Sequence, residues 1–150
     1  MKLTGVDVFD ATVERSTSWL QDLMRELNWS DRRESYIALR SVLHGLRDHL
    51  PTEQAVQFGN QLPMLIRGFY FENWKIQGRP LPSTSREELL AGICRYFNPD
   101  EYSTSSAETV VRAVFRLLDR KVIDGEIEDF HNILPGDIQE LWSAAAHRAA

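Results

Sequence analysis

One short pattern occurs twice in this sequence, and the repetition constrains the fold more than any other feature. The pattern F-x-N-x-L-P begins at Phe58 and again at Phe130. With its two prolines aligned, at an offset of 72 residues, eight of the 33 pairs between 38–70 and 110–142 are identical. The matches fall on apolar and turn positions, which a shared fold would constrain. We therefore predict an internal duplication of one structural unit.

The similarity continues upstream of the aligned block with a shift of two residues. Two apolar series have the same spacing at an offset of 70: Trp19, Leu20, Leu23, Met24 and Leu27, and then Leu89, Leu90, Ile93, Cys94 and Phe97. Each unit then spans about 55–65 residues, which is too long for one repeat of a solenoid. We expect a first unit at 1–75, a linker rich in Pro, Gly and Ser at 76–84, and a second unit at 85–150.

Within one unit, apolar residues three and four positions apart predict amphipathic helices. A first helix should begin near Asp7. Its apolar residues form a stripe that starts at Phe9, continues for five turns and should face a core. Ser30 is the expected N-cap of the second helix. Pro51 should end that helix, because a proline disfavours helical geometry in the residue before it. Thr52 would then cap a short third helix.

The repeated pattern itself predicts a sharp corner between the third and fourth helices. Pro63 suits the first turn of a new helix, where its missing N–H carries no penalty. Leu62 would fill the core at the corner, and the Asn60 side chain would bond a freed backbone group. In the second unit, capping boxes are expected at Ser85/Glu88 and Ser105/Glu108. The predicted fold is therefore all-α, with two tandem pseudo-equivalent units of about four helices packed into one compact bundle.

Four segments of the chain resemble a known family: "ALRSVLHGLRDHL", "QLPMLIRGFYFENW", "REELLAGICRYF" and "VFRLLDRKVIDGEIEDFHNILPGDIQELW". Together they are similar to the prokaryotic helical family named domain of unknown function 2267, over residues 9–142. The resemblance implies an all-helical bacterial protein of two similar halves, and it implies no activity. The sequence departs from the family pattern at "FENW", where "YEGW" is common.

Charge and composition exclude some functions and favour others. The net charge of −5 argues against nucleic acid as a partner, because phosphate binding needs a basic surface. The single cysteine, Cys94, allows no internal disulfide and is expected to be a buried thiol. There is no apolar signal core at the N-terminus and no 18-residue apolar run, so no membrane span is expected. We predict a bacterial cytoplasmic protein.

The most distinctive candidate surface is the aromatic segment that follows the first corner. The second copy is simpler there, since "QELW" stands where the first has "RGFYFENW". Three interpretations are open: the aromatic residues seal the joint between the halves, they form an interface for a partner protein or a second copy, or they line a ligand pocket. The candidate interaction residues are Arg67, Phe69, Tyr70, Phe71 and Trp74.

The histidines offer weak candidates for metal or haem. His44 and Asp48 share a helix face with His49 beside them, but a metal needs three or four converging ligands. We interpret the pair as a solvated face beside Arg47. A haem would need an axial ligand on an apolar wall, and His131 is better explained as a capped, partly exposed histidine. No cofactor or metal is therefore predicted.

Three functional hypotheses follow from this sequence. The first is a non-catalytic protein-interaction or scaffold module, self-associating through residues 69–74. The second is a carrier of a small apolar ligand or lipid, which requires a cavity between the halves. The third is an enzyme of unknown type, although no nucleophile motif, P-loop or dinucleotide fingerprint is present in the sequence.

Overall fold

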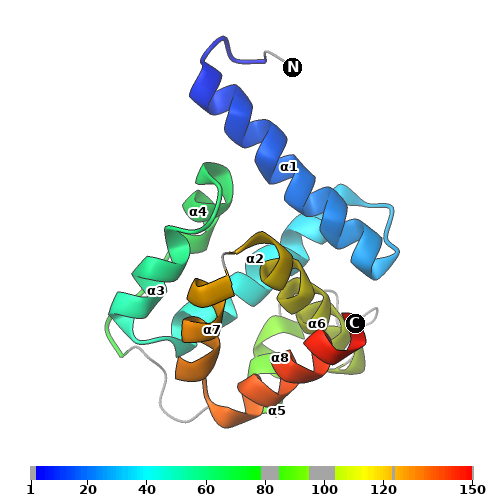
Figure 1. Cartoon of the computed structure of the whole chain (residues 1–150), viewed down its shortest axis with the longest axis vertical. Coiled ribbons are helices and arrows are strands. Elements are labelled where there is room, and N and C mark those ends of the chain that lie inside the picture. The colour runs from blue at the N-terminus through cyan, green and yellow to red at the C-terminus, as the bar shows by residue number, and fades with distance from the viewer. Residues whose placement is uncertain (1–2, 79–84, 95–103, 123, 150) are drawn as a thin grey trace.

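The computed structural model describes residues 3–78, 85–122 except 95–103, and 124–149, and within these residues all regular secondary structure is helical (Figure 1). This confirms the predicted all-α class. The helices are α1 (Asp7–Leu27), α2 (Arg32–His49), α3 (Thr52–Gly59), α4 (Met64–Phe71), α5 (Arg86–Cys94), α6 (Thr104–Lys121), α7 (Asp124–Ile133) and α8 (Gly136–Ala149).

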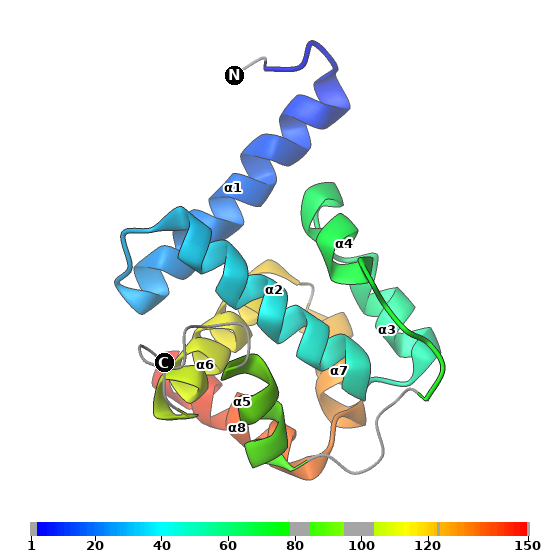
Figure 2. The same ribbon diagram turned by 180° about the vertical axis from the view of Figure 1, so that it is seen from behind.

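Two long helices, α2 and α6, organise the bundle. α2 contacts α1, α3, α4, α5 and α6, and α6 contacts α1, α2, α5, α7 and α8. Figure 2 shows α2 crossing the middle of the molecule, with α3 and α4 on one side and α5 and α8 on the other. The sides of α2 and α6 that face these neighbours carry fully buried leucines, valines and Phe115. Burial of these side chains supplies most of the driving force for folding.

The helices of the two halves make contacts in the same pattern. In the first half α1 meets α2 and α4, while α2, α3 and α4 meet one another; α5, α6, α7 and α8 repeat the same set of pairs. Between the halves, α2 packs on α6 and α3 on α7, while α1 packs on α6 and α5 on α2. Exchanging the halves leaves this pattern unchanged. That the two units superpose, and that they divide at the predicted linker, remain predictions.

Two predicted helix caps are wrong, and one is found. Asp31, not Ser30, caps α2: its Oδ1 accepts from the N–H of Arg33 at 2.8 Å. A carboxylate is also favoured by the helix dipole at this end. α3 begins at Thr52 with Pro51 as its N-cap and has no side-chain cap. Ser85 Oγ accepts from the N–H of Glu88 at 3.2 Å, as half of the predicted capping box. The Ser105 side chain lies outside the described residues.

The corner at Leu62–Pro63 forms as predicted, but a different side chain satisfies its backbone. Leu62 is buried, and α4 begins directly after Pro63. The freed carbonyls of Asn60 and Leu62 accept from Arg67 Nη2, at 3.4 and 3.0 Å. Arg67 therefore does what was predicted of the Asn60 side chain.

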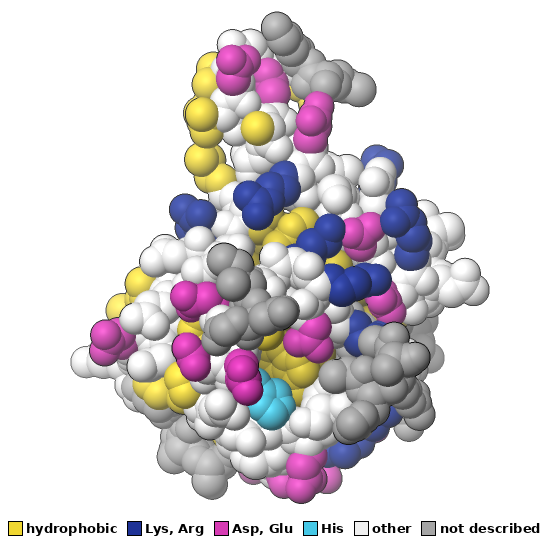
Figure 3. Space-filling model, in the orientation of Figure 1, with side chains coloured by type: hydrophobic (Ala, Val, Ile, Leu, Met, Phe, Trp, Pro, Cys, Tyr) yellow, Lys and Arg dark blue, Asp and Glu magenta, His cyan; other side chains and the backbone are white. Residues whose placement is uncertain are grey.

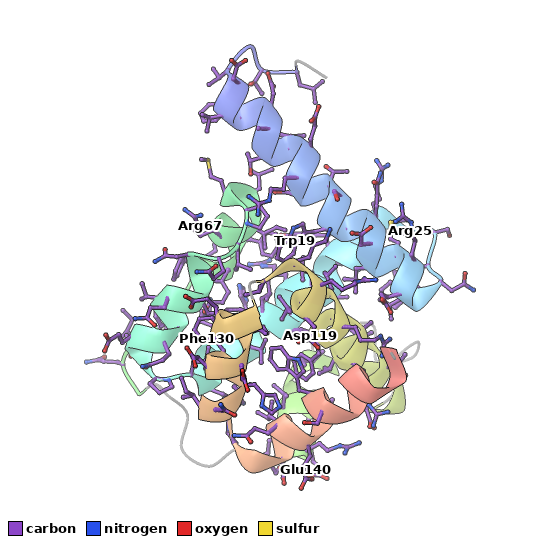
Figure 4. The ribbon with its side chains drawn as sticks, in the orientation of Figure 1. Trp19, Arg25, Arg67, Asp119, Phe130 and Glu140 are labelled. Carbon is purple, nitrogen blue, oxygen red and sulfur yellow. The ribbon has the colours of Figure 1, made fainter. Side chains whose placement is uncertain are left out.

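The first part of α1 projects beyond the rest of the bundle (Figure 1). Farther along this helix Trp19 and Leu23 are buried, and Figure 4 shows Trp19 pointing from α1 into the body. Phe9, at the start of the same predicted stripe, is 50% exposed. The prediction that the whole stripe faces a core is therefore wrong for its first turns, because the body ends before α1 does.

Aromatic packing and ion pairs join the two halves. The aligned residues Phe58 and Phe130 contact each other edge to face, with ring centroids 5.0 Å apart. On the other side of the joint, Glu26 of α1 accepts from Arg116 of α6 at 2.8 Å and pairs with Arg120 at 3.0 Å. Within the described residues, no helix is both long and apolar enough to cross a membrane.

Candidate functional site

Two basic side chains of α2 enclose the C-terminal end of α4. His44 Nε2 lies 2.6 Å from the Phe69 carbonyl, and Arg47 Nη1 donates to the carbonyls of Tyr70 at 2.7 Å and Glu72 at 3.1 Å. These carbonyls have no intrahelical partner, and cationic or donor groups are favoured at this end of a helix. His44 and Arg47 are both buried, so the prediction of a solvated face is wrong. The cluster is a structural cap on α4.

Burial sets the protonation state of this region. Desolvation lowers the pKa of His44 below its ordinary 6.5, and the nearby positive charge of Arg47 acts in the same direction. At neutral pH His44 is therefore uncharged, and its Nε2–H donates to the Phe69 carbonyl. Burial also raises the pKa of the Tyr70 hydroxyl, which donates to the Ala55 carbonyl at 2.6 Å.

The predicted interaction residues do not form one exposed patch. Tyr70 is 0% exposed, so a partner cannot reach its side chain in this conformation. Phe69 is half-buried against Tyr36, with centroids 5.2 Å apart, and Phe71 packs on Trp74 at 5.8 Å. Arg67 is held by the corner carbonyls. These contacts support the reading in which the aromatic residues seal the fold, and a partner for the half-buried ones stays a prediction.

Large apolar side chains are exposed elsewhere, where α1 projects past the start of α4. Val8 is 57% exposed, and Phe9 and Leu65 are each 50% exposed. We name this region the α1–α4 surface and define it by Val6, Val8, Phe9, Met64 and Leu65. Figure 3 shows hydrophobic side chains in a column along the projecting part of the molecule. Clustered exposure of this kind is typical of a binding surface.

Hydrogen bonds fix both sides of the α1–α4 surface. The N–H of Leu65, in the first turn of α4, donates to the buried Thr12 hydroxyl of α1 at 3.2 Å. Val8 and Phe9 lie about one turn before Thr12 on the same helix, so the two apolar groups are neighbours. At the chain's start, the Thr4 N–H and hydroxyl donate to Asp10 Oδ1 at 2.8 and 2.9 Å, which lowers the pKa of Asp10.

Sequence reasoning missed this surface, although the alignment of the two halves held a signal. Met64 and Leu65 align with Gly136 and Asp137 at the offset of 72. The same corner is thus built in the second half with no apolar side chain at either position. The fold does not require Met64 and Leu65 to be apolar, and an exposed apolar residue that the fold does not require is a candidate for binding.

Other groups in the described residues do not assemble a chemical site. Ser143 Oγ lies 3.3 Å from His131 Nε2, but that nitrogen also faces the Gln139 carbonyl at 3.2 Å. Since a carbonyl only accepts, the nitrogen that faces it carries the proton and cannot act as a base toward Ser143. No group of three metal ligands occurs within the described part of the chain. The side chain of Cys94 falls outside that part.

Comparison with known proteins places the chain in a family. The model of a family described as "Uncharacterized conserved protein (DUF2267)" matches residues 16–141. The chain belongs to the DUF2267 family. No curated protein matches it. The DUF2267 match includes α4 but begins after the exposed turns of α1, so the α1–α4 surface combines a family element with residues outside the match.

Proposed function

We propose that this DUF2267 protein is a non-catalytic protein-interaction module that binds its partner through the α1–α4 surface. The observation that carries the proposal is the exposure of five apolar residues at the start of α1 and the start of α4, two segments that the Thr12–Leu65 hydrogen bond holds together. Burial of such side chains is the usual source of binding energy at protein interfaces, and each of these positions has apolar area to remove from water.

The rigidity of the surface supports the same function. The Thr12–Leu65 hydrogen bond sets the spacing of α1 and α4, and α4 is anchored at its other end by His44 and Arg47. A surface held in place before binding loses little conformational entropy when a partner arrives. The fixed surface should therefore bind a partner more tightly than a comparable exposed segment that must first become ordered.

The alternative of an apolar carrier has less support. A carrier needs an enclosed apolar cavity of several hundred Å³. Where α3 meets α7, the touching rings of Phe58 and Phe130 occupy the joint between the halves. A hollow of about 320 Å³ lies instead at the turn between α1 and α2, open to solvent and lined by Arg25 and Arg32 among others. Neither region has the character of a lipid site.

Site-specific photo-crosslinking in cells tests the proposed function. A benzophenone side chain placed at Val8 should give a discrete protein adduct, and one placed at the exposed Ile76 should give none. Phe9→Asp should abolish the adduct from position 8 while circular dichroism shows an unchanged helix content. If position 8 gives no adduct, or the same adducts as position 76, the α1–α4 surface is not a binding surface.

A further inference from the structure

Only part of the apolar stripe of α1 packs against the bundle. Counted from the exposed Val6, the stripe alternates steps of three and four residues throughout: Val6, Phe9, Val13, Ser16, Leu20, Leu23 and Leu27. This spacing of 3.5 residues is the seam by which one helix packs along another. The later residues meet the protein body, where Leu23 and Ser16 are buried. Phe9 continues the seam into solvent, and the exposed Val6 lies just before the helix begins.

The form of this surface favours a helix as its occupant. One wall is the projecting part of α1, the other is the first turn of α4 with Met64 and Leu65, and the buried Thr12 lies between them. Both walls are helices, so beyond their first turns their backbone groups bond within the helix, and the Leu65 N–H in the first turn of α4 bonds Thr12. An extended strand would find few backbone partners there, whereas a helix brings its own hydrogen bonds and needs only apolar contact.

The charges around the surface select among possible helices. Residues 3–15 carry three acids, Asp7, Asp10 and Glu14, and one base, Arg15. Asp7 and Glu14 are exposed, whereas Asp10 is buried and accepts from Thr4. The basic residue of α4, Arg67, is directed at the corner carbonyls. The surface is therefore an apolar seam with a net acidic border, which attracts a partner with Lys or Arg beside its own apolar residues.

The same border disfavours a second copy of the chain. Two copies packed along the projecting parts of α1 would bring two net-acidic borders together, and like charges across an interface oppose association. The part of α1 before the buried Thr12, residues 7–11, is about 8 Å long at the rise of an α-helix. Contact over so short a length suits a transient complex better than a permanent dimer.

We propose that the α1–α4 surface binds a basic amphipathic helix of another protein, which extends the seam of α1 beyond the end of the bundle. This inference rests on the proposed function, because it names the kind of partner that the surface takes. The partner helix would place an apolar stripe against Val8, Phe9 and Leu65. Its Lys or Arg residues would lie beside Asp7 and Glu14.

Two synthetic helical peptides test the inference with the full-length protein. They share one leucine stripe and differ only in their flanking residues, which are Lys in one and Glu in the other. By fluorescence anisotropy the Lys peptide should bind at least about tenfold more tightly, and added salt should shrink the difference. Phe9→Asp should abolish binding of the Lys peptide, and Ile76→Asp should leave it unchanged. Asp7→Asn combined with Glu14→Gln should weaken the Lys peptide only.

The outcomes separate this inference from the function on which it rests. If both peptides bind equally and Phe9→Asp abolishes both, the surface binds helices without regard to charge and the inference is wrong. If light scattering shows a dimer that Phe9→Asp dissolves, the occupant is a second copy, and the inference is again wrong while the interaction function stands. If the Lys peptide does not bind, the inference is overturned. If, in addition, a benzophenone at position 8 gives no adduct in the protein that keeps Phe9, the function is overturned as well.

Discussion

The two proline corners of this protein are built alike and then used differently. At the first, Arg67 donates to the carbonyls of Asn60 and Leu62; at the second, Gln139 donates to those of Asn132 and Leu134, at 3.1 and 2.7 Å. The four carbonyls align pairwise at the offset of 72, and so do the two donors. A cation and a neutral amide thus serve the same purpose, so the geometry of the corner depends on a donor and not on its charge.

The positions around the corners show where the halves differ. Phe71 packs over Gly59, where an added Cβ would lie 2.5 Å from the Phe71 ring. The aligned pair is Ser143 and His131, which contact each other in the second half. A large residue and a small one have exchanged places. The summed side-chain volume is therefore similar in the two halves where the helices must pack. Met64 and Leu65, by contrast, align with residues that are not apolar, so the fold tolerates their apolar side chains without requiring them.

Removing the aromatic pair at the joint should have the largest effect on stability. Phe58→Ala and Phe130→Ala should each lower the free energy of unfolding by about 3–5 kcal/mol, because each empties a fully packed site. Urea denaturation followed by circular dichroism gives both values. The double variant should destabilise by less than the sum, since the rings contact each other. Strict additivity would show that the two rings do not stabilise each other and that the joint lies elsewhere.

Substitution of Arg47 should separate the two halves most clearly. Arg47→Met should lower the free energy of unfolding by about 2–4 kcal/mol, because the carbonyls of Tyr70 and Glu72 lose a buried charged donor. At the aligned position, Asp119 accepts from Trp142 Nε1 at 2.9 Å, and Asp119→Ala should cost about 1 kcal/mol. Equal losses in the two variants would contradict the view that α4 depends on its basic cap more than α8 depends on Asp119.

How far the sequence predicts this molecule depends on the kind of interaction. Spacing and proline chemistry are local, so the start of α1, the end of α2 before Pro51 and the turn at Leu62–Pro63 were all predictable. The identity of a hydrogen-bond donor is a tertiary property, and Arg67 was therefore missed in favour of Asn60. The burial of His44 and Arg47 was missed for the same reason, because nothing in "HGLRDH" says that α4 ends against it.

The α1–α4 surface shows a different limit. Periodicity states that a stripe exists on α1, and it cannot state where the neighbouring helices end. Phe9 and Leu23 are equivalent by spacing, yet one is half exposed and the other is fully buried, because α4 begins near Thr12. The aligned Gly136 and Asp137 distinguish positions 64 and 65, because the second half builds the same corner with no apolar side chain at either place.

Substitutions at Gly59 and Phe71 should have an intermediate effect on stability and test whether the two positions share one volume. Gly59→Ala should lower the free energy of unfolding by about 1–3 kcal/mol, because the new methyl group overlaps the rings of Phe71 and Tyr70. Adding Phe71→Ser, the residue of the second half, should relieve part of this loss by making room. Thermal unfolding of the two single variants and the double variant measures the coupling. A double variant that is destabilised by the full sum would mean that the two positions do not share one volume.

The smallest expected effect concerns pH and again distinguishes α4 from α8. Well above pH 6.5, His44 is neutral in both the folded and the unfolded chain, so it contributes no pH dependence to stability. Below 6.5 the unfolded chain binds a proton there while the folded protein, with its lowered pKa, resists it, and stability falls as the pH falls. The aligned residue in the second half is Arg116 and not a histidine. His44→Gln keeps a donor for the Phe69 carbonyl and should flatten the decline between neutral and mildly acidic pH. Asp22, whose pKa Lys121 lowers from 3.8, affects stability only at more acidic pH.

Amide hydrogen exchange between pH 7 and pH 5, corrected for intrinsic rates, should show α4 losing protection before α8. Equal loss in both helices, or an unchanged slope in His44→Gln, would show that acid acts on the molecule through another group.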